Sequence, residues 1–431
     1  MKLISATLNT VKTVASPLSA FLAGTGLTCC AFSLLSSTLA LRMTQNGIST
    51  SEAGIILSLY YAGYILASFW SHHLINRVGH IRTFCAFISI FSAIVPLHAL
   101  SPWAPYWGFL RLSEGFCIGT CFMCLESWLN TRSNNKNRGL IMSLYMITTY
   151  LGSSLGQLFL NLPDNNGLLI YVFVASLFSI ALVPISLTAL PSPDITVHKS
   201  MSLVKLYKIS PVGVTGCFAS GFLVGAFYIL GAIYCRQIGL DVKHTSIFMF
   251  CGIFGGMLAQ LPVGRLSDKM DRRYVLLGMS VFLLFIAPLV QFLIHENTII
   301  LAIGAAVLGG GTFVMYPVCV SHVNDQIEDS ERVNASSMLI LLQSMGLIIG
   351  PIIISFAMQH WGAVWFLLSF SVVSIAVIAN TAKQIATKPL NYITVTPTDP
   401  MPLAPTHAYN ELTQDDSLLD KARELLVEKK H

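Results

Sequence analysis

Charged residues are scarce in this sequence. Asp, Glu, Lys and Arg together make up 10% of the 431 residues, whereas a soluble domain typically carries about 25%. The mean hydropathy is +0.69, and the few charges gather in short clusters between long apolar stretches. This composition excludes an ordinary soluble domain and predicts a chain that lies mostly within a lipid bilayer.

Sequence signatures of catalysis and cofactor binding are missing as well. There is no phosphate-binding loop, zinc motif or nucleophile elbow, so we expect neither an enzyme nor a cofactor. The 10 cysteines lie mainly within apolar stretches and form no disulfide framework. Cys117, Cys121 and Cys124 share one helical face, but no second stretch offers a matching cluster. They are interpreted as small packing residues, and no metal site is predicted.

Long apolar runs account for most of the chain. A helix that crosses a bilayer needs roughly 20 mainly apolar residues, and about twelve runs meet that criterion. The sequence therefore predicts an all-α membrane protein with twelve transmembrane helices, near 17–41, 51–75, 82–101, 104–128, 139–162, 168–190, 210–235, 244–263, 274–294, 298–320, 334–358 and 362–382.

Lys and Arg are unevenly distributed between the connections. Counted from an inside N-terminus, the inside connections hold most of them, among them Arg77, Arg138 and Arg272, and the outside connections hold few. By the positive-inside rule both termini are predicted to be cytoplasmic. The basic residues are spread over separate loops, so no nucleic-acid partner is expected.

Two segments far apart in the sequence resemble each other. NTRSNNKNRGLIMS begins at Asn130 and NDQIEDSERVNASS begins at Asn324, an offset of 194 residues. At the same offset fall pairs of glycines and one pair of arginines: Gly115 and Gly309, Gly152 and Gly346, Gly156 and Gly350, Arg138 and Arg332.

A second pair of segments, HHLINRVGHIR (72–82) and GRLSDKMDRRY (264–274), repeats at a spacing of 192. Two blocks at nearly one offset indicate an internal duplication, as in many transporters. We predict a six-helix bundle over 1–190, a cytoplasmic linker over 191–208, a second bundle over 209–383 and a largely disordered cytoplasmic tail over 384–431.

These segments resemble the major facilitator superfamily, whose loop between helices two and three carries the pattern G-x-L-a-D-R-x-G-R-K. The copy that starts at Gly264 matches well, except that Asp271 stands where a second glycine is usual. The first copy keeps Arg77 and Gly79 but has Asn76 in place of the aspartate. Glu126-Ser127-Trp128-Leu129-Asn130 and Tyr316-Pro317 are similar to the YcaD-like branch of that family.

The resemblance implies that this loop helps to lock one conformation. Because Asn76 cannot supply the aspartate charge, we expect Glu126 to act as the acidic partner of Arg77 or Arg138. The alternative is that Glu126 is a solvated carboxylate at a helix end. The candidates for the conformational lock are Asn76, Arg77, Gly79, Glu126, Arg138, Gly264, Asp268, Arg272 and Arg332.

Two ionisable residues stand out inside an apolar run. Arg111 and Glu114 are three residues apart and share one helical face. Such residues cost at least roughly 2.5–3.5 kcal/mol to insert, which makes them candidates for function. Arg111 would attract an anionic group or tune the proton affinity of Glu114. The alternative is an ion pair that only neutralises both charges.

The other candidate cavity residues are polar but neutral. They are Thr25, Thr28, Tyr60, Tyr64, Tyr145, Thr149, Ser153, Gln157, Tyr228, Gln260, Tyr316, Gln343 and Ser344. Family architecture places helices one, four, seven and ten around the pathway. By that resemblance the candidates for substrate binding or coupling are Arg111, Glu114, Thr28, Tyr228 and Tyr316.

These features predict a secondary active transporter of a small organic solute that works by alternating access and is coupled to protons. Its expected partners are that solute, the proton and the lipid of the inner (plasma) membrane, and a monomer is expected. A drug-efflux antiporter is an alternative, weakened because Gln157 stands where the antiporter branch prefers proline. A receptor or scaffold that binds a ligand without moving it is a further alternative.

Overall fold

A computed structural model describes residues 2–132, 138–164, 167–187, 201–294 and 297–387, which form helices and short connections without any strand. The N-terminal bundle consists of α1 Lys2–Gln45, α2 Thr50–Val78, α3 His80–Ile94 with the 3-10 helix η1 Val95–Ala99, α4 Ala104–Arg132, α5 Arg138–Leu158 with η2 Phe159–Asn161, and α6 Leu169–Ser186. The short helix α7 Leu203–Ile209 leads into the second half. The C-terminal bundle consists of α8 Pro211–Gln237, α9 Val242–Lys269, α10 Arg272–Leu293, α11 Thr298–Phe313, α12 Met315–Asn324, α13 Asp329–Trp361 and α14 Trp365–Thr387.

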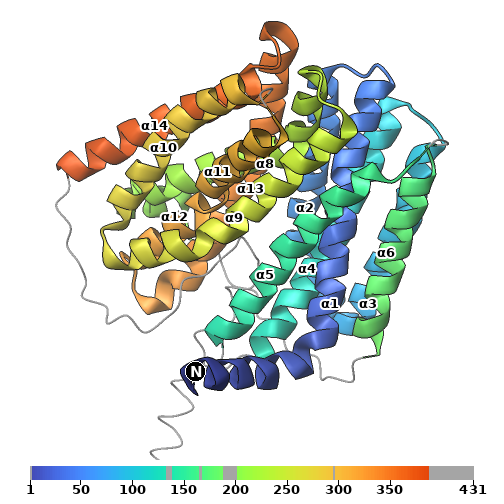
Figure 1. The fold of residues 1–431 in the computed structure, drawn as a ribbon. Helices are drawn as coiled ribbons and strands as arrows, with labels where there is room; N and C mark the ends of the chain where they lie inside the picture. Colours follow the sequence, from blue (N-terminus) through green and yellow to red (C-terminus); the bar gives the residue numbers. More distant parts are fainter. Residues whose placement is uncertain (1, 133–137, 165–166, 188–200, 295–296, 388–431) are drawn as a thin grey trace, which may run out of the picture.

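The two bundles are visible as separate halves in Figure 1. Eleven helical segments of the described residues are long and apolar enough to cross a membrane, and α5 packs beside them along α1. α11 and α12 follow each other within one such segment. The predicted all-α class with two six-helix bundles is therefore confirmed.

Several helix boundaries differ from the predicted runs. The run at 298–320 is broken at Val314, because Pro317 has no N–H to donate to the Phe313 carbonyl one turn earlier. α1 begins at Lys2, well before 17, and Figure 1 shows its first turns lying across the end of the N-terminal bundle. α7 begins within the predicted linker 191–208, whose first ten residues lie outside the described part. α14 extends to Thr387, and the rest of the predicted tail is not described.

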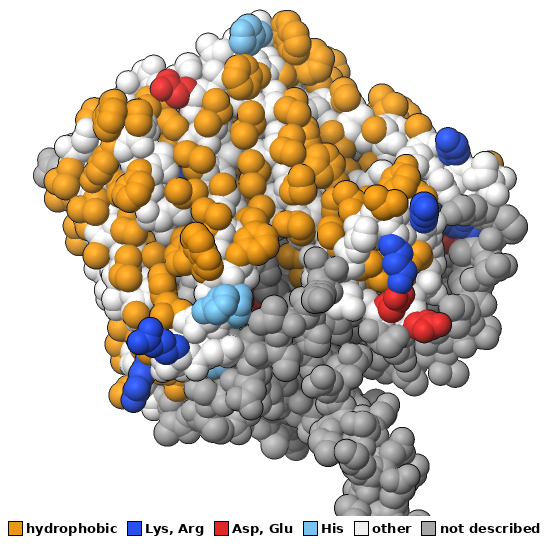
Figure 2. Space-filling model, turned by 180° about the vertical axis from the view of Figure 1, so that it is seen from behind, with side chains coloured by type: hydrophobic (Ala, Val, Ile, Leu, Met, Phe, Trp, Pro, Cys, Tyr) orange, Lys and Arg blue, Asp and Glu red, His pale blue; other side chains and the backbone are white. Residues whose placement is uncertain are grey.

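Apolar side chains cover the outer face of the molecule. Figure 2 shows them spread over one whole side, with the basic residues of this view at its lower left and along its right edge. Phe69, Trp70, Phe285 and Phe292 are each more than half exposed. In water so many exposed rings would promote aggregation, whereas in a bilayer they contact acyl chains. This surface agrees with a multi-pass membrane protein.

The repeated glycines hold the helices of each bundle together. Gly115 of α4 lies against the Tyr60 carbonyl of α2, and Gly309 of α11 lies against the Gly252 carbonyl of α9. A side chain at either glycine would collide with the backbone of the neighbouring helix. These contacts correspond between the halves, since 309 − 115 = 194 and 252 − 60 = 192. The two bundles therefore share one packing scheme built on close backbone approach.

A second glycine contact repeats in the same way. Gly152 and Gly156 of α5 pack on the α1 backbone at Gly26 and Cys30. Gly346 and Gly350 of α13 pack on the α8 backbone at Phe218 and Phe222. Each pair of helices thus approaches closely along two turns, as small-residue interfaces in membranes do.

The bundles touch mainly at one end of the molecule. Thr50 at the start of α2 receives a hydrogen bond from Gln237 Nε2 (2.6 Å), and its backbone N–H donates to Gln359 Oε1 (2.9 Å). Ser246 Oγ of α9 donates to the Gln157 carbonyl of α5 (2.7 Å). Figure 1 shows the bundles meeting at this end, which we call the closed end, and diverging toward the end that holds the N-terminus.

Candidate substrate cavity

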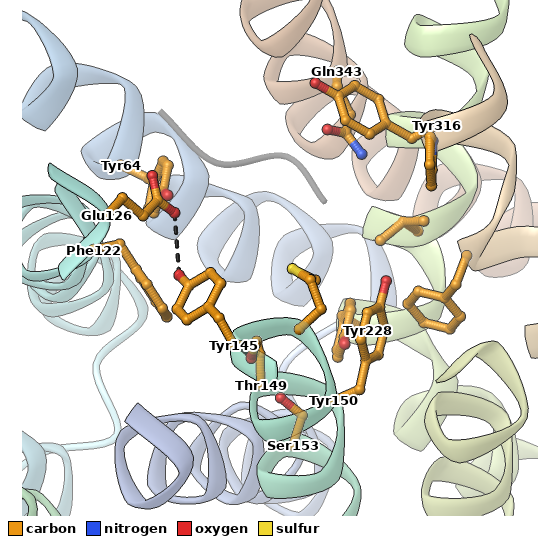
Figure 3. Close-up of a pocket in the computed structure, with 14 residues that line it drawn as sticks. Tyr64, Phe122, Glu126, Tyr145, Thr149, Tyr150, Ser153, Tyr228, Tyr316 and Gln343 are labelled. Atoms are coloured by element: carbon orange, nitrogen blue, oxygen red, sulfur yellow. Dashed lines mark hydrogen bonds between the residues drawn. The ribbon is translucent and has the colours of Figure 1, made fainter. Parts of the chain in front are cut away.

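A cavity of about 160 Å³ lies between the two bundles. The N-terminal bundle contributes residues of α2, α4 and α5, and the C-terminal bundle contributes residues of α8, α11, α12 and α13 (Figure 3). The lining consists of Tyr64, Phe122, Glu126, Tyr145, Met146, Thr149, Tyr150, Ser153, Val224, Tyr228, Phe313, Tyr316, Pro317 and Gln343. A space bordered by both halves is where an alternating-access transporter holds its substrate.

The acidic member of this lining is Glu126. Its side chain comes from α4, is 1% exposed and accepts a hydrogen bond from the Tyr145 hydroxyl of α5 at 3.1 Å. Figure 3 shows Tyr64 of α2 beside the same carboxylate. Because burial strengthens every electrostatic interaction of a charge, this carboxylate dominates the electrostatics of the described lining.

Aromatic rings form the opposite part of the cavity. Phe313 of α11 meets Tyr228 of α8 edge-to-face, with ring centroids 5.4 Å apart, and meets Tyr150 of α5 at 6.0 Å. Edge-to-face pairs of this kind hold rings in fixed orientations. The cavity is therefore a preformed space with rigid apolar walls.

The C-terminal bundle adds a polar group to the cavity. Gln343 of α13 is 2% exposed, and no described residue donates a hydrogen bond to its Oε1 atom. Figure 3 shows Gln343 and Tyr316 together, across the cavity from Glu126. A buried amide oxygen without a donor is unfavourable by roughly 1–3 kcal/mol, which a bound group with an N–H or O–H would recover.

The predicted pair Arg111 and Glu114 lies elsewhere. Arg111 Nη1 donates to Glu114 Oε2 at 2.7 Å, and neither residue belongs to the cavity lining. The guanidinium lies over the Tyr60 ring, 4.6 Å from its centroid. The pair is enclosed within the N-terminal bundle, with exposures of 1% for Arg111 and 0% for Glu114.

His98 joins this buried pair. Its Nδ1 atom lies 3.5 Å from Glu114 Oε1, and its ring packs between Trp107 and Tyr171. We call His98, Arg111 and Glu114 the buried charge cluster. The opposite charges of Arg111 and Glu114 neutralise each other, which lowers the cost of placing them in a medium of low dielectric constant.

Comparisons with known proteins agree with this architecture. The sequence profile described as Major Facilitator Superfamily matches residues 21–258 and 236–400. The chain belongs to the major facilitator superfamily. It is 26% identical over 355 residues to the Escherichia coli (strain K12) "Uncharacterized MFS-type transporter YcaD", an alignment that covers 81% of this chain and 91% of that protein.

Two solved transporter structures share the fold. A variant of the nucleoside transporter NupG superposes with a TM-score of 0.71 at 15% identity, covering 85% of this chain and 99% of that one. A bacterial homolog of the human lysosomal transporter Spinster, in an inward-facing and occupied conformation, gives a TM-score of 0.68 at 14% identity, with 86% and 96% covered. These similarities show that the chain shares the fold of these transporters.

The superfamily loop of the C-terminal bundle forms a network of charges. Arg272 donates to Asp325 at the end of α12 (2.6 Å), to Ser267 (2.9 Å) and to Asp268 (3.4 Å). Asp271, where the family prefers glycine, caps α10 by accepting from the Arg273 N–H at 2.9 Å. It also pairs with the Arg273 guanidinium at 3.0 Å, so this departure from the pattern anchors the start of α10.

The corresponding loop of the N-terminal bundle is simpler. Gly79 alone joins α2 to α3 with a φ of 93°, a conformation that favours glycine. Asn76 and Arg77 are exposed on the last turn of α2. The side chain of Arg138 lies outside the described residues. The assignment of the nine predicted residues to a conformational lock therefore stays a prediction: Asn76, Arg77, Gly79, Glu126, Arg138, Gly264, Asp268, Arg272 and Arg332.

Of the substrate candidates, Tyr228 and Tyr316 line the cavity, whereas Thr28 donates to the Gly24 carbonyl of its own helix at 2.8 Å. Glu126 lies inside the cavity, so the alternative of a solvated helix-end carboxylate is wrong. Gln157 accepts from Ser37 Oγ at 2.7 Å and donates to the Ser33 carbonyl at 2.9 Å. The residue that replaces the antiporter proline thus ties α5 to α1.

Sequence reasoning missed several cavity residues. Met146 and Tyr150 follow Tyr145 and Thr149 by one residue each and so extend the same stripe of α5. That spacing could have predicted them. Phe122 and Phe313 carried no such signal, because an aromatic residue in an apolar run packs in the same way against lipid or a neighbouring helix.

Proposed function

We propose that this chain is a secondary active transporter that carries a small organic solute by alternating access of the cavity between its two bundles. The observation behind the proposal is the position of that cavity: both bundles line it, and they meet mainly at the closed end. Rocking of one bundle against the other would close the diverging end and open the closed one. The stiff glycine contacts within each bundle support a rigid-body movement of this kind.

The orientation follows from the basic loops. With both termini in the cytoplasm of a bacterial cell, the protein resides in the inner membrane and the conformation described here opens inward. Arg272 and Arg273 would then lie in the anionic headgroup layer on the cytoplasmic side. The closed end would face the periplasm.

Coupling to protons is part of the proposal, with Glu126 as the proton-binding carboxylate. It is the carboxylate of the described cavity lining, and the titratable Tyr64 and Tyr145 face it from α2 and α5. When the cavity is empty, a proton that neutralises Glu126 would lower the free energy needed to enclose this carboxylate as the protein changes between its inward-open and outward-open states. The pair Arg111 and Glu114 remains the second candidate, acting from within the N-terminal bundle.

Alternating access predicts that the cavity is reachable from both sides of the membrane. We expect a cysteine placed at Thr149 in the lining to react with a membrane-impermeant maleimide added to either face of oriented vesicles. The half-buried Cys85 and Cys251 are first replaced by serine. Ser58→Cys, at a position that is 1% exposed and outside the cavity, should react from neither face. Labelling of Thr149→Cys from one face only would favour the receptor or scaffold.

A cross-link at the closed end should arrest the cycle. Asn161 Nδ2 of η2 donates to Ser246 Oγ of α9 at 3.0 Å, so cysteines at both positions are close enough for a short bifunctional thiol reagent. We expect cross-linking of Asn161→Cys with Ser246→Cys to abolish labelling of Thr149→Cys from the closed side and to preserve it from the open side. Each single-cysteine variant treated in the same way is the control. Unchanged two-sided labelling after complete cross-linking would contradict the proposed movement.

A further inference from the structure

We propose that the solute is an organic monocation, with an ammonium-type group held near Glu126 and an apolar or aromatic body held against the rings of Tyr150, Tyr228 and Phe313. This inference rests on the proposed function, because it names the ligand class of the same cavity. It is carried by the side chains that the two bundles place around one space.

The sign of the charge follows from the cavity lining. Glu126 is buried, and the described lining residues include no Lys, Arg or His. An anionic solute would bring a second negative charge close to this carboxylate in a medium of low dielectric constant, where like charges repel strongly. A cation would interact favourably with the carboxylate, as charges do across complementary surfaces.

The aromatic side chains that line the cavity also favour an organic cation. Seven of the fourteen lining residues are aromatic: Tyr64, Phe122, Tyr145, Tyr150, Tyr228, Phe313 and Tyr316. The faces of such rings carry partial negative charge and attract organic cations, above all those that shed their water easily. A strongly hydrated Ca²⁺ or Mg²⁺ ion is normally held by several ligands that include carboxylates, whereas Glu126 is the single carboxylate of the described lining.

The C-terminal bundle completes the arrangement. The buried Gln343 Oε1 atom has no donor among the described residues and lies across the cavity from Glu126 (Figure 3). Because Gln343 lines the cavity, this oxygen adds a partial negative charge to the wall that the C-terminal bundle contributes. Both bundles would therefore contact an electropositive solute, which is what a transported ligand must do to couple their movement.

The size of the cavity limits the solute. A volume of about 160 Å³ is small compared with drug-sized pockets of about 300–1,000 Å³. We therefore expect a cation with a single ring or an equivalent apolar body. Large multi-ring compounds would require the bundles to move apart.

The test compares two ions of matched shape and opposite charge on purified full-length protein. Benzyltrimethylammonium carries a permanent positive charge and benzylsulfonate a permanent negative one on the same benzyl group. We expect calorimetry to show binding of the first and not of the second. Glu126→Gln should weaken binding of benzyltrimethylammonium about 10- to 100-fold, and Tyr228→Leu should weaken it about 3- to 10-fold.

Glu52→Gln is the matched control, because Glu52 is an exposed carboxylate at the start of α2 and does not line this cavity. The Glu52→Gln variant should bind benzyltrimethylammonium with the affinity of the wild-type protein. Preference for benzylsulfonate, equal binding of both ions, no binding of the cation to folded protein, or unchanged affinity of Glu126→Gln would each overturn the proposal.

The outcome is separable from that of the proposed function. Two-sided labelling of Thr149→Cys together with binding of the anion would support the proposed transport and contradict the proposed cationic ligand. Binding of the cation together with one-sided labelling would support the proposed ligand class and contradict the proposed transport.

Discussion

Replacing Arg111 with alanine is expected to lower the free energy of unfolding by about 3–5 kcal/mol. The substitution would leave the Glu114 carboxylate, which is 0% exposed, without the guanidinium that lies 2.7 Å from it. An uncompensated charge in a membrane interior is one of the few single defects with so large an effect. Denaturant titration of the purified protein in detergent, followed by circular dichroism, would measure it.

Two control variants test whether the loss of stability comes from the unpaired charge. Arg82→Ala removes an exposed arginine of α3 and should change the stability by less than about 0.5 kcal/mol. The double variant Arg111→Met and Glu114→Met removes both charges and should recover most of the loss. A stable double variant whose Thr149→Cys label no longer appears from both faces would show that the pair takes part in the cycle. Stability of Arg111→Ala equal to that of the wild type would contradict the expectation.

Gly115→Leu is expected to prevent recovery of folded protein. Gly115 lies against the Tyr60 carbonyl of α2, and on the same interface Gly63 lies against the Leu112 carbonyl of α4. A leucine side chain would force two backbones apart along the crossing, and the cost would exceed the 1–3 kcal/mol typical of an overpacked core. Size-exclusion chromatography of the detergent-solubilised protein would show the loss of the monodisperse peak.

The duplication supplies a parallel experiment and a control. Gly309→Leu should have the same effect in the C-terminal bundle, because Gly309 lies against the Gly252 carbonyl of α9. Gly278→Leu is the control, since Gly278 of α10 is exposed and a Cβ atom added there would meet nothing within 4 Å. A normal peak for Gly115→Leu would mean that α2 and α4 are free to separate, and the rigid-bundle description would be wrong.

The helices and their duplication could be predicted from the sequence because lipid imposes a simple rule. Apolar length determines where a span lies, and the glycines at 115 and 309, or 152 and 346, mark where two backbones touch. The break at Val314 was missed, although Pro317 was a visible signal. Hydropathy averages over about nineteen residues and does not detect one missing hydrogen bond.

The cavity was less predictable for a different reason. Tyr228 and Tyr316 could be chosen from the family architecture, but Glu126 was expected as a partner of Arg77 or Arg138 and not as part of the cavity lining. Its true environment depends on Tyr145, nineteen residues away on another helix. His98 was likewise missed, since its approach to Glu114 follows from the turn of η1, which periodicity does not reveal.

The hydrogen bonds that described residues form between the two halves at the closed end all join neutral groups. Every ion pair between two described side chains lies within one half of the chain, whereas Thr50, Gln237, Gln359, Gln157 and Ser246 join the halves through uncharged donors and acceptors. Mobile ions screen charges but leave neutral hydrogen bonds almost unchanged. The closed end should therefore open at nearly the same rate in dilute and in saline surroundings.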